Sequence, residues 1–281
     1  MAARFPSKLK LLEEKVPEGL IVTAAWLEQN GYSSSLRSQY LKAGWLEQPT
    51  RGVFRRVRGT LRWEQVVISL QTLLAFPVTV GGRTALELQG YAHFLLQEQR
   101  EVHLYGQETL PNWVGKLPMP TRLVFHKRTR VFRADLAKSD FTNLPQAVNT
   151  DARVNADLIE DGFTRMPWGQ WDWPLTLSTP ERALLELLDE LPTRESFHVV
   201  DKLVEGLVSL SPKRLQKLLE NCGNVKVKRL FFFFADRHNP AWLKRIEREK
   251  VNLGAGDRML VRGGKFDPVY RITVPADLDA V

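Results

Sequence analysis

The stretch that decides the fold is TAAWLEQNGYSSSLRSQYLKAGWLEQPTRGVFRRV, residues 23–57. It contains two short helical patterns, each preceded by a hydroxyl residue suited to an N-cap and followed by a glycine. Two short strand-like runs follow, and a proline-containing turn joins them. The helices are expected over residues 24–30 and 34–43, and the strands over residues 45–47 and 52–57. This order is typical of a winged helix-turn-helix.

In a winged helix-turn-helix, the second helix of the pair lies in the DNA major groove. A helix advances by about 100° per residue, so Leu36, Tyr40 and Ala43 share one face, which we expect to pack inward. Gln39 falls nearer that face and is left out of the candidate set. Small hydroxyl side chains allow close approach to the groove, and cations reach bases or phosphates. The candidate DNA-binding residues are Ser34, Ser35, Arg37, Ser38 and Lys42 on the helix, and Arg51, Arg55 and Arg56 on the hairpin.

The charge distribution favours the same end of the chain. Forty Lys and Arg residues against 32 Asp and Glu residues give a net charge of +8. Residues 1–62 hold eleven bases and five acids, so most of the excess lies there. Such an excess is compatible with nucleic-acid binding without establishing it. A helix pair with a basic hairpin also occurs in other small α/β units and in winged helices that bind proteins.

Composition excludes several classes of protein. The 281 residues are 43% hydrophobic and 26% charged, which are ordinary values for a globular chain. Cys222 is the single cysteine, so no intramolecular disulfide can form, and a reducing cytoplasm is the expected location. No apolar run approaches the roughly 20 residues of a membrane span, and no secretory signal is recognisable. We expect no membrane partner.

The remainder of the chain predicts a larger, mixed domain. Helical and strand-like patterns alternate after residue 60, and helices dominate after Pro180. The expected fold is therefore α+β, with a winged helix-turn-helix over residues 1–60 and a helix-rich α/β domain over residues 61–281. Residues 225–235 fit either a helix or a strand. Near the end of the chain, we expect a helix over residues 240–250 and a hairpin of residues 258–262 and 269–274 across Gly263 and Gly264.

Catalytic signatures are missing. The five histidines do not have metal-ligand spacing, and no Gly-x-Ser-x-Gly elbow is present. The stretch GGRT, residues 81–84, lacks the glycine spacing and the lysine of a phosphate-binding loop, so a helix-capping turn is expected. Acidic residues between Asp151 and Asp161 could serve a metal-dependent nuclease, but no spacing singles any of them out, and a solvated acidic face is the better interpretation. We expect no catalytic residue, no cofactor and no metal.

Three blocks of the sequence resemble the AbiEi antitoxins of bacterial AbiE abortive-infection systems, which are type IV toxin–antitoxin systems. The blocks occur in the family's order and span roughly residues 20–235. They are YLKAGWLE with RGVFRR (residues 40–47 and 51–56), GGRTALELQG (residues 81–90) and STPERALLELL (residues 178–188).

This resemblance implies a two-part protein without a catalytic role. Its amino-terminal domain would bind inverted repeats in its own promoter and repress the operon. Two copies would occupy the two half-sites, by dimerisation or by cooperativity on the DNA. The larger domain would counteract a nucleotidyltransferase-like toxin, directly or functionally. The DNA contacts implied by the resemblance fall on the same eight helix and hairpin residues. A DNA-targeted nuclease-like enzyme and a protein-interaction adaptor that never touches DNA remain the alternatives.

Overall fold

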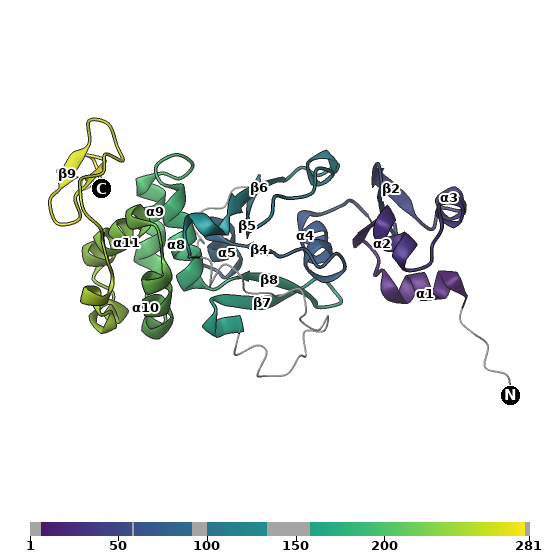
Figure 1. Ribbon diagram of the computed structural model, residues 1–281, viewed down its shortest axis with the longest axis horizontal. Helices are drawn as coiled ribbons and strands as arrows, with labels where there is room; N and C mark the ends of the chain where they lie inside the picture. The colour runs from purple at the N-terminus through teal and green to yellow at the C-terminus, as the bar shows by residue number, and fades with distance from the viewer. Residues whose placement is uncertain (1–6, 58, 92–99, 134–157, 279–281) are drawn as a thin grey trace.

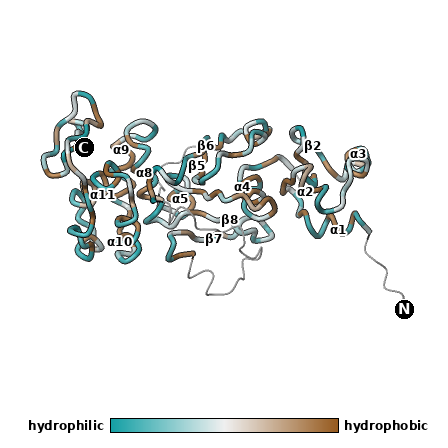
Figure 2. Tube along the Cα trace, viewed as in Figure 1, coloured by the Kyte–Doolittle hydropathy of each residue, from teal (hydrophilic) through white to brown (hydrophobic). Residues whose placement is uncertain are grey.

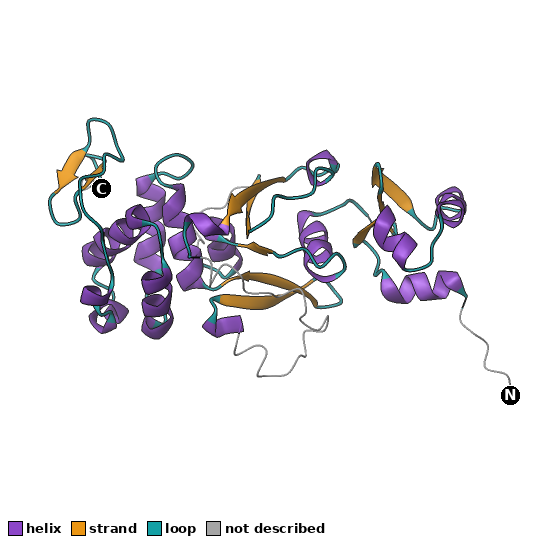
Figure 3. Cartoon of the chain, in the orientation of Figure 1, coloured by secondary structure: helices purple, strands orange, loops and turns teal. Residues whose placement is uncertain are grey.

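The computed structural model describes residues 7–57, 59–91, 100–133 and 158–278. Along its longest axis, a small amino-terminal unit lies at one end and a short carboxyl-terminal hairpin at the other (Figure 1). A five-stranded sheet lies between them, and most of the helices gather on the side of the sheet that faces the hairpin (Figure 3). The mixed α+β fold with a helix-rich larger part is confirmed.

The amino-terminal unit has the expected arrangement of helices and strands. Its three strands form an antiparallel sheet in the order β1-β3-β2, with Val22 opposite Phe54 in the central pairing. The helix pair is joined by a turn in which Gly31 has φ +85°, a backbone conformation that favours glycine. The elements are α1 (Lys8–Lys15), β1 (Ile21–Thr23), α2 (Ala24–Gln29), α3 (Ser34–Lys42), β2 (Glu47–Thr50) and β3 (Val53–Arg55).

Local chemistry explains the helix starts. The Thr23 hydroxyl accepts a hydrogen bond from the backbone N–H of Trp26 at 3.2 Å, which caps α2. The Ser33 hydroxyl does the same for the N–H of Leu36 at 3.4 Å at the start of α3. Both caps are the residues that the sequence predicts.

The small unit has a core of its own but is also fastened to the rest of the molecule. Leu27, Tyr40 and Phe54 belong to a local hydrophobic cluster. Ile21 of β1 belongs instead to the main core, and its backbone N–H donates to the Ser69 hydroxyl at 2.8 Å. Because β1 and β3 contribute to both clusters, the division after residue 60 stays a prediction.

Helix α4 (Trp63–Thr72) connects the small unit to the central sheet and is one of the more hydrophobic elements of the chain (Figure 2). The sheet has the order β6-β5-β4-β8-β7 and mixes parallel and antiparallel pairs. β5 and β6 run parallel, as do β4 and β8, whereas the other neighbours are antiparallel. The strands are β4 (Val78–Val80), β5 (Glu101–Gly106), β6 (Arg122–Lys127), β7 (Phe163–Trp168) and β8 (Trp173–Ser178).

The helices after the sheet bury most of the remaining apolar residues. Phe231, Phe232 and Phe234 are buried on one helix, so the ambiguous stretch at residues 225–235 is helical. The helices are α5 (Gly82–Leu88), α8 (Pro180–Glu190), α9 (Phe197–Gly206), α10 (Pro212–Asn221) and α11 (Val225–His238), with short 3-10 helices η1 (Val114–Lys116), η2 (Arg128–Arg130), η3 (Ala241–Arg245) and η4 (Arg248–Lys250).

Two expectations for the carboxyl-terminal segment are wrong. The single helix expected over residues 240–250 is replaced by η3 and η4. The hairpin pairs β9 (Lys265–Asp267) with β10 (Ile272–Val274), so its turn is at residues 268–271 instead of at Gly263 and Gly264. A carboxylate oxygen of Asp267 accepts a hydrogen bond from the Tyr270 N–H at 2.7 Å, and this side-chain turn fixes the position of the hairpin.

A buried carboxylate joins the two later sequence blocks at the centre of the fold. Glu186 of α8 accepts hydrogen bonds from the Ser178 hydroxyl at 2.8 Å and from the Gly82 N–H at 3.0 Å. It also pairs with Nε of Arg182 at 3.1 Å, and both side chains are fully buried. A Cβ on Gly81 would lie 2.2 Å from a Glu186 oxygen. Glycine is therefore required for the close approach of α5 to α8.

The Arg182 guanidinium is held between two aromatic rings. Its central carbon lies 4.2 Å from the ring centroids of both Phe132 and Phe163. Burial lowers the pKa of Arg182, and the charge of Glu186 opposes that effect. The ion pair with Glu186 therefore allows the Arg182 guanidinium to stay charged while it is buried.

We predict that Glu186→Gln destabilises the protein strongly, because Arg182 would be left buried without its counter-charge. Breaking a buried ion pair costs about 3–5 kcal/mol. Glu205→Gln is the matched control: Glu205 pairs with Lys202 on the surface, where such pairs contribute about 1 kcal/mol or less. Urea unfolding followed by circular dichroism gives both free energies. Equal values for the two variants would contradict the role of Glu186.

Candidate nucleic-acid interface

The outward face of α3 is polar and carries small side chains. Ser34, Ser35, Ser38 and Lys42 are all exposed on it. Tyr40 is buried on the opposite face, where it belongs to the local core. A helix with such a face can approach a DNA groove closely, because no bulky side chain separates its backbone from the bases.

The packing of α3 differs from the expected face in two places. Ala43, expected to pack inward, is exposed, and Gln39, left out as an inward residue, is exposed as well. Leu41, with an apolar side chain, is only partly buried and packs against the local core. The inward stripe is therefore centred on Tyr40, and Gln39 joins the outward face as a residue that the sequence reasoning missed.

The β2–β3 turn presents Arg51 to solvent. Pro49 lies in β2, which is an edge strand of its sheet, where a residue without an N–H is tolerated. Gly52 completes the turn with φ +78°. Arg51 and Lys42 form no ion pair within the described residues, so both cations are available to an external anion.

Arg37 is used inside the domain. Its side chain is only 11% exposed, and Nη1 donates to the backbone oxygens of Tyr32 at 2.7 Å and Ala24 at 3.4 Å. The guanidinium also lies 6.0 Å from the centroid of the Phe54 ring. Arg37 thus ties α3 to the start of α2.

Arg55 and Arg56 are also engaged within the unit. Arg55 is buried, its Nε pairs with the Glu47 carboxylate, and its Nη2 donates to the Gly59 oxygen at 2.7 Å. Arg56 pairs with Glu13 at 3.5 Å and Glu18 at 3.4 Å. These contacts join β3 and the residue after it to β2, to α1 and to the segment between α1 and β1.

The eight residues predicted to bind DNA thus fall into two groups. Ser34, Ser35, Ser38, Lys42 and Arg51 are exposed on α3 and the hairpin, whereas Arg37, Arg55 and Arg56 have intramolecular partners. The sequence alone could not separate the two groups. Whether an arginine is exposed or pairs within the unit depends on which residues the fold brings next to it. The role of all eight residues in DNA binding stays a prediction.

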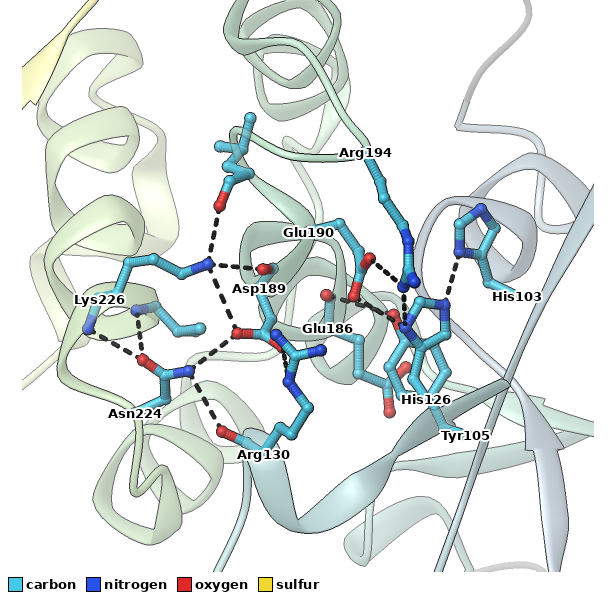
Figure 4. A network of polar contacts seen from close by, with 12 residues as sticks. His103, Tyr105, His126, Arg130, Glu186, Asp189, Glu190, Arg194, Asn224 and Lys226 are labelled. Carbon is cyan, nitrogen blue, oxygen red and sulfur yellow. Dashed lines mark hydrogen bonds and ion pairs between the residues drawn. The ribbon is translucent and has the colours of Figure 1, made fainter. Parts of the chain in front are cut away.

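A second polar cluster lies at the junction of the central sheet with α8 (Figure 4). Nδ1 of His103 lies 2.9 Å from Nε2 of His126, and Nδ1 of His126 lies 2.9 Å from a carboxylate oxygen of Glu190. Arg194 approaches both His126 and Glu190 at 3.2 Å. Because β5 and β6 are parallel neighbours, residues 23 positions apart in the chain meet here, which spacing alone does not reveal.

The surroundings of His103 and Glu190 shift the pKa values of both side chains. Burial and the neighbouring His126 lower the pKa of His103 to about 4, so His103 is neutral at neutral pH. Burial acts to raise the pKa of Glu190, but His126 and Arg194 outweigh it, and the pKa lies below its usual value. With its histidines buried, the arrangement holds β5, β6 and α8 in place.

Asp189 anchors the other side of the same junction (Figure 4). It accepts a hydrogen bond from the Asn224 amide at 2.9 Å, and it pairs with Arg130 at 3.2 Å and Lys226 at 3.6 Å. The start of α11 is thereby fixed to α8 and η2. Three of the basic residues outside the winged helix therefore serve the fold: Arg130, Lys226 and Arg194.

The described residues offer little for catalysis. Burial raises the pKa of the Cys222 thiol to about 11, so it stays protonated and is a poor nucleophile. Glu160 and Asp161 pair with Lys213 and Lys217. Asp151 lies outside the residues that the structure describes. In the described part of the chain, no group of three or more His, Cys, Asp or Glu residues is placed to hold a metal ion.

Gly81 is the N-cap of α5 and residues 82–84 form the first turn of that helix, so this stretch starts a helix as the sequence predicts. No described helix is long and apolar enough to cross a membrane.

We predict that substitutions of arginines in the two groups change stability by different amounts. Arg55→Ala removes the pair with Glu47 and the bond to Gly59, so it should destabilise the protein by about 2 kcal/mol. Arg51→Ala changes an exposed side chain and should stay within about 0.5 kcal/mol of the parent. Thermal unfolding of the full chain compares the two. A loss for Arg51→Ala as large as that for Arg55→Ala would refute this assignment.

Comparison with known proteins agrees with this architecture. Residues 6–97 match the family model described as the AbiEi antitoxin N-terminal domain of transcriptional regulators. Residues 99–275 match the model described as a transcriptional regulator, AbiEi antitoxin, of type IV toxin–antitoxin systems. No curated protein matches the sequence.

A solved structure shares the fold. The crystal structure of the RV2827C protein from Mycobacterium tuberculosis superposes with a TM-score of 0.53 at 15% identity, covering 96% of this chain and 91% of that one. At this identity the similarity concerns the fold alone. Together, the two family matches span nearly the whole length, and the chain belongs to the AbiEi family of antitoxin transcriptional regulators of type IV toxin–antitoxin systems.

Proposed function

We propose that this protein represses its own operon by binding promoter DNA through the winged helix, and that its larger part counteracts a nucleotidyltransferase-like toxin without catalysis of its own. The observation that carries the proposal is the outward face of α3. It combines three exposed serines with Lys42, and Arg51 is exposed on the adjoining hairpin. The protein would act on DNA in the cytoplasm.

The division of labour on DNA follows from side-chain chemistry. Lys42 and Arg51 would contact phosphates, which fixes the position of the protein on the duplex without reading sequence. Ser34, Ser35 and Ser38 both donate and accept hydrogen bonds, so α3 in the major groove would read base edges through them. Gln39 is long enough to contribute a contact to adenine.

A single copy would bind weakly. Since three of the predicted arginines have partners within the unit, few cations remain to neutralise phosphates, and affinity rises with that number. Two copies on the two halves of an inverted repeat would supply the affinity of a repressor. This reasoning supports binding to paired half-sites in the promoter.

We predict that Arg51→Ala and Lys42→Ala weaken binding to operator and random DNA alike and reduce the salt dependence, because phosphate contacts are lost. Ser38→Ala should weaken operator binding by about tenfold with little effect on random DNA. Fluorescence anisotropy with the DNA upstream of the protein's own gene, in a salt series with random competitor, measures both.

Ser196→Ala is the matched control for the serine change, because Ser196 caps α9 in the larger part of the chain. Its DNA affinity should equal that of the parent. Equal loss on operator and random DNA for Ser38→Ala would rule out base reading by α3. Absent or salt-insensitive binding by the parent protein would favour the protein-interaction adaptor instead.

The two activities should separate by mutation. The double variant Lys42→Ala/Arg51→Ala should lose repression of a promoter reporter but still protect cells that express the toxin encoded beside this gene. Its exposed side chains lie on the winged helix, away from the larger domain. Survival is compared at matched protein levels, which immunoblotting verifies. Loss of protection at normal abundance would contradict a toxin-opposing role for the larger part.

A further inference from the structure

The central sheet has an open edge at β6, its uppermost strand in Figure 1. In the described part of the chain, β6 pairs with β5 and with no other strand. The Arg122 N–H donates to the Arg100 oxygen at 2.8 Å, which is the β5 side. Backbone groups of successive residues in a parallel strand point to opposite sides, so those of Leu123 and Phe125 point away from β5. An edge of this kind is a template for another strand.

A cavity lies beside the first residues of this edge. It has a volume of about 570 Å³ and is enclosed by the connection between β5 and β6 together with the start of β6. Its size falls in the range of roughly 300–1,000 Å³ that is typical of ligand pockets. Apolar side chains form much of its wall, among them Leu110, Val114, Met119 and Leu123. Because Leu123 belongs to both the cavity and β6, a strand added to β6 passes the cavity.

The surroundings of this edge are basic. The sequence between Glu108 and Asp135 contains six Lys and Arg residues and no acid. Three of the six are used inside the molecule: Arg122 pairs with Glu101, Arg128 is buried, and Arg130 pairs with Asp189. Lys116 and Lys127 are exposed and form no ion pair with a described residue. One lies in η1, next to the cavity, and the other is the last residue of β6, so both can meet carboxylates of a partner.

We propose that the β6 edge and the adjoining cavity dock an extended segment of a partner protein, rich in acidic and apolar residues, which adds a strand to the central sheet. Main-chain hydrogen bonds along β6 hold the segment, and one of its apolar side chains enters the cavity. Its carboxylates complement Lys116 and Lys127.

The observations favour a peptide over a nucleic acid. The outward N–H and C=O groups of a strand match those of another strand, and the cavity wall is largely apolar. Two unpaired lysines would neutralise few phosphates, so they are a weak basis for binding a nucleic acid.

The edge is positioned in advance. All six residues of β6 are in register with β5, and His126 contacts Glu190 of α8 at 2.9 Å. A fixed strand loses little conformational freedom when it pairs. The edge and the cavity lie outside the winged helix, so the proposal holds or fails independently of operator binding.

The probe is a fluorescein-labelled peptide of sequence ELELELE, titrated with the full chain in the absence of DNA and followed by fluorescence anisotropy. We expect saturable binding with a Kd of about 100 µM or tighter. The peptide KLKLKLK, with the opposite charges, should bind at least about tenfold more weakly.

Charge reversal on the protein tests the same contacts. The double variant Lys116→Glu/Lys127→Glu should bind ELELELE about tenfold more weakly than the parent. Lys244→Glu is the matched control, because it changes an exposed lysine on η3 and should leave the affinity unchanged.

A pair of variants at Leu123 tests the strand pairing itself. Leu123→Pro removes an outward N–H, which an edge strand tolerates, whereas Leu123→Ala loses the same side chain and keeps the donor. Leu123→Pro should weaken binding about fivefold more than Leu123→Ala. Circular dichroism verifies that both variants fold. If Leu123→Pro does not fold, ELELELE with its three central residues N-methylated replaces it and should not bind to the parent.

Three results would overturn the proposal. They are an absence of ELELELE binding, equal binding of ELELELE and KLKLKLK, and binding that neither Leu123→Pro nor N-methylation weakens. Tighter binding of a single-stranded oligonucleotide that Lys116→Glu/Lys127→Glu abolishes would assign the surface to a nucleic acid instead.

Discussion

The buried pair of Glu186 and Arg182 is the interaction on which the rest of the fold depends. The Glu186 carboxylate accepts hydrogen bonds from the Ser178 hydroxyl at the end of β8, from the first N–H of α5 and from the Arg182 guanidinium of its own helix. Such a group is tolerated inside a protein only when all its partners are present together. The sheet, α5 and α8 therefore reach their positions as one assembly, and this explains why two sequence blocks nearly a hundred residues apart meet.

Basic residues in this chain have two distinct uses. Arg37, Arg55 and Arg56 link backbone segments of the winged helix, whereas Lys42 and Arg51 remain outside. The net positive charge of the small unit therefore overstates the number of its cations that are available to an external anion. In the DNA complex that we propose, the small hydroxyl groups and few cations on the outward face of α3 would favour specificity over strong general affinity.

The amino acid sequence predicts the parts of this structure that depend on local chemistry. Thr23 and Ser33 cap their helices because a hydroxyl can reach the N–H three residues on, and Gly31 takes the positive φ of the turn. The partners of Arg55 and the meeting of His103 with His126 depend on strand neighbours that come from distant positions. The sequence predicts the hairpin turn at Gly263 and Gly264. The turn lies instead at residues 268–271, where the Asp267 carboxylate accepts a hydrogen bond from the backbone N–H of Tyr270.

β1 belongs to two cores at once, and this has a consequence for communication within the molecule. Its backbone is bonded to Ser69 of α4, and the same strand supports the helix pair of the winged helix. A shift of α4 therefore moves a strand whose Val22 belongs to the same hydrophobic cluster as Tyr40 of α3. If the amino-terminal unit binds operator DNA as proposed, a ligand that binds the larger part and displaces α4 changes operator affinity, and by thermodynamic linkage the operator changes the affinity of that ligand by the same factor.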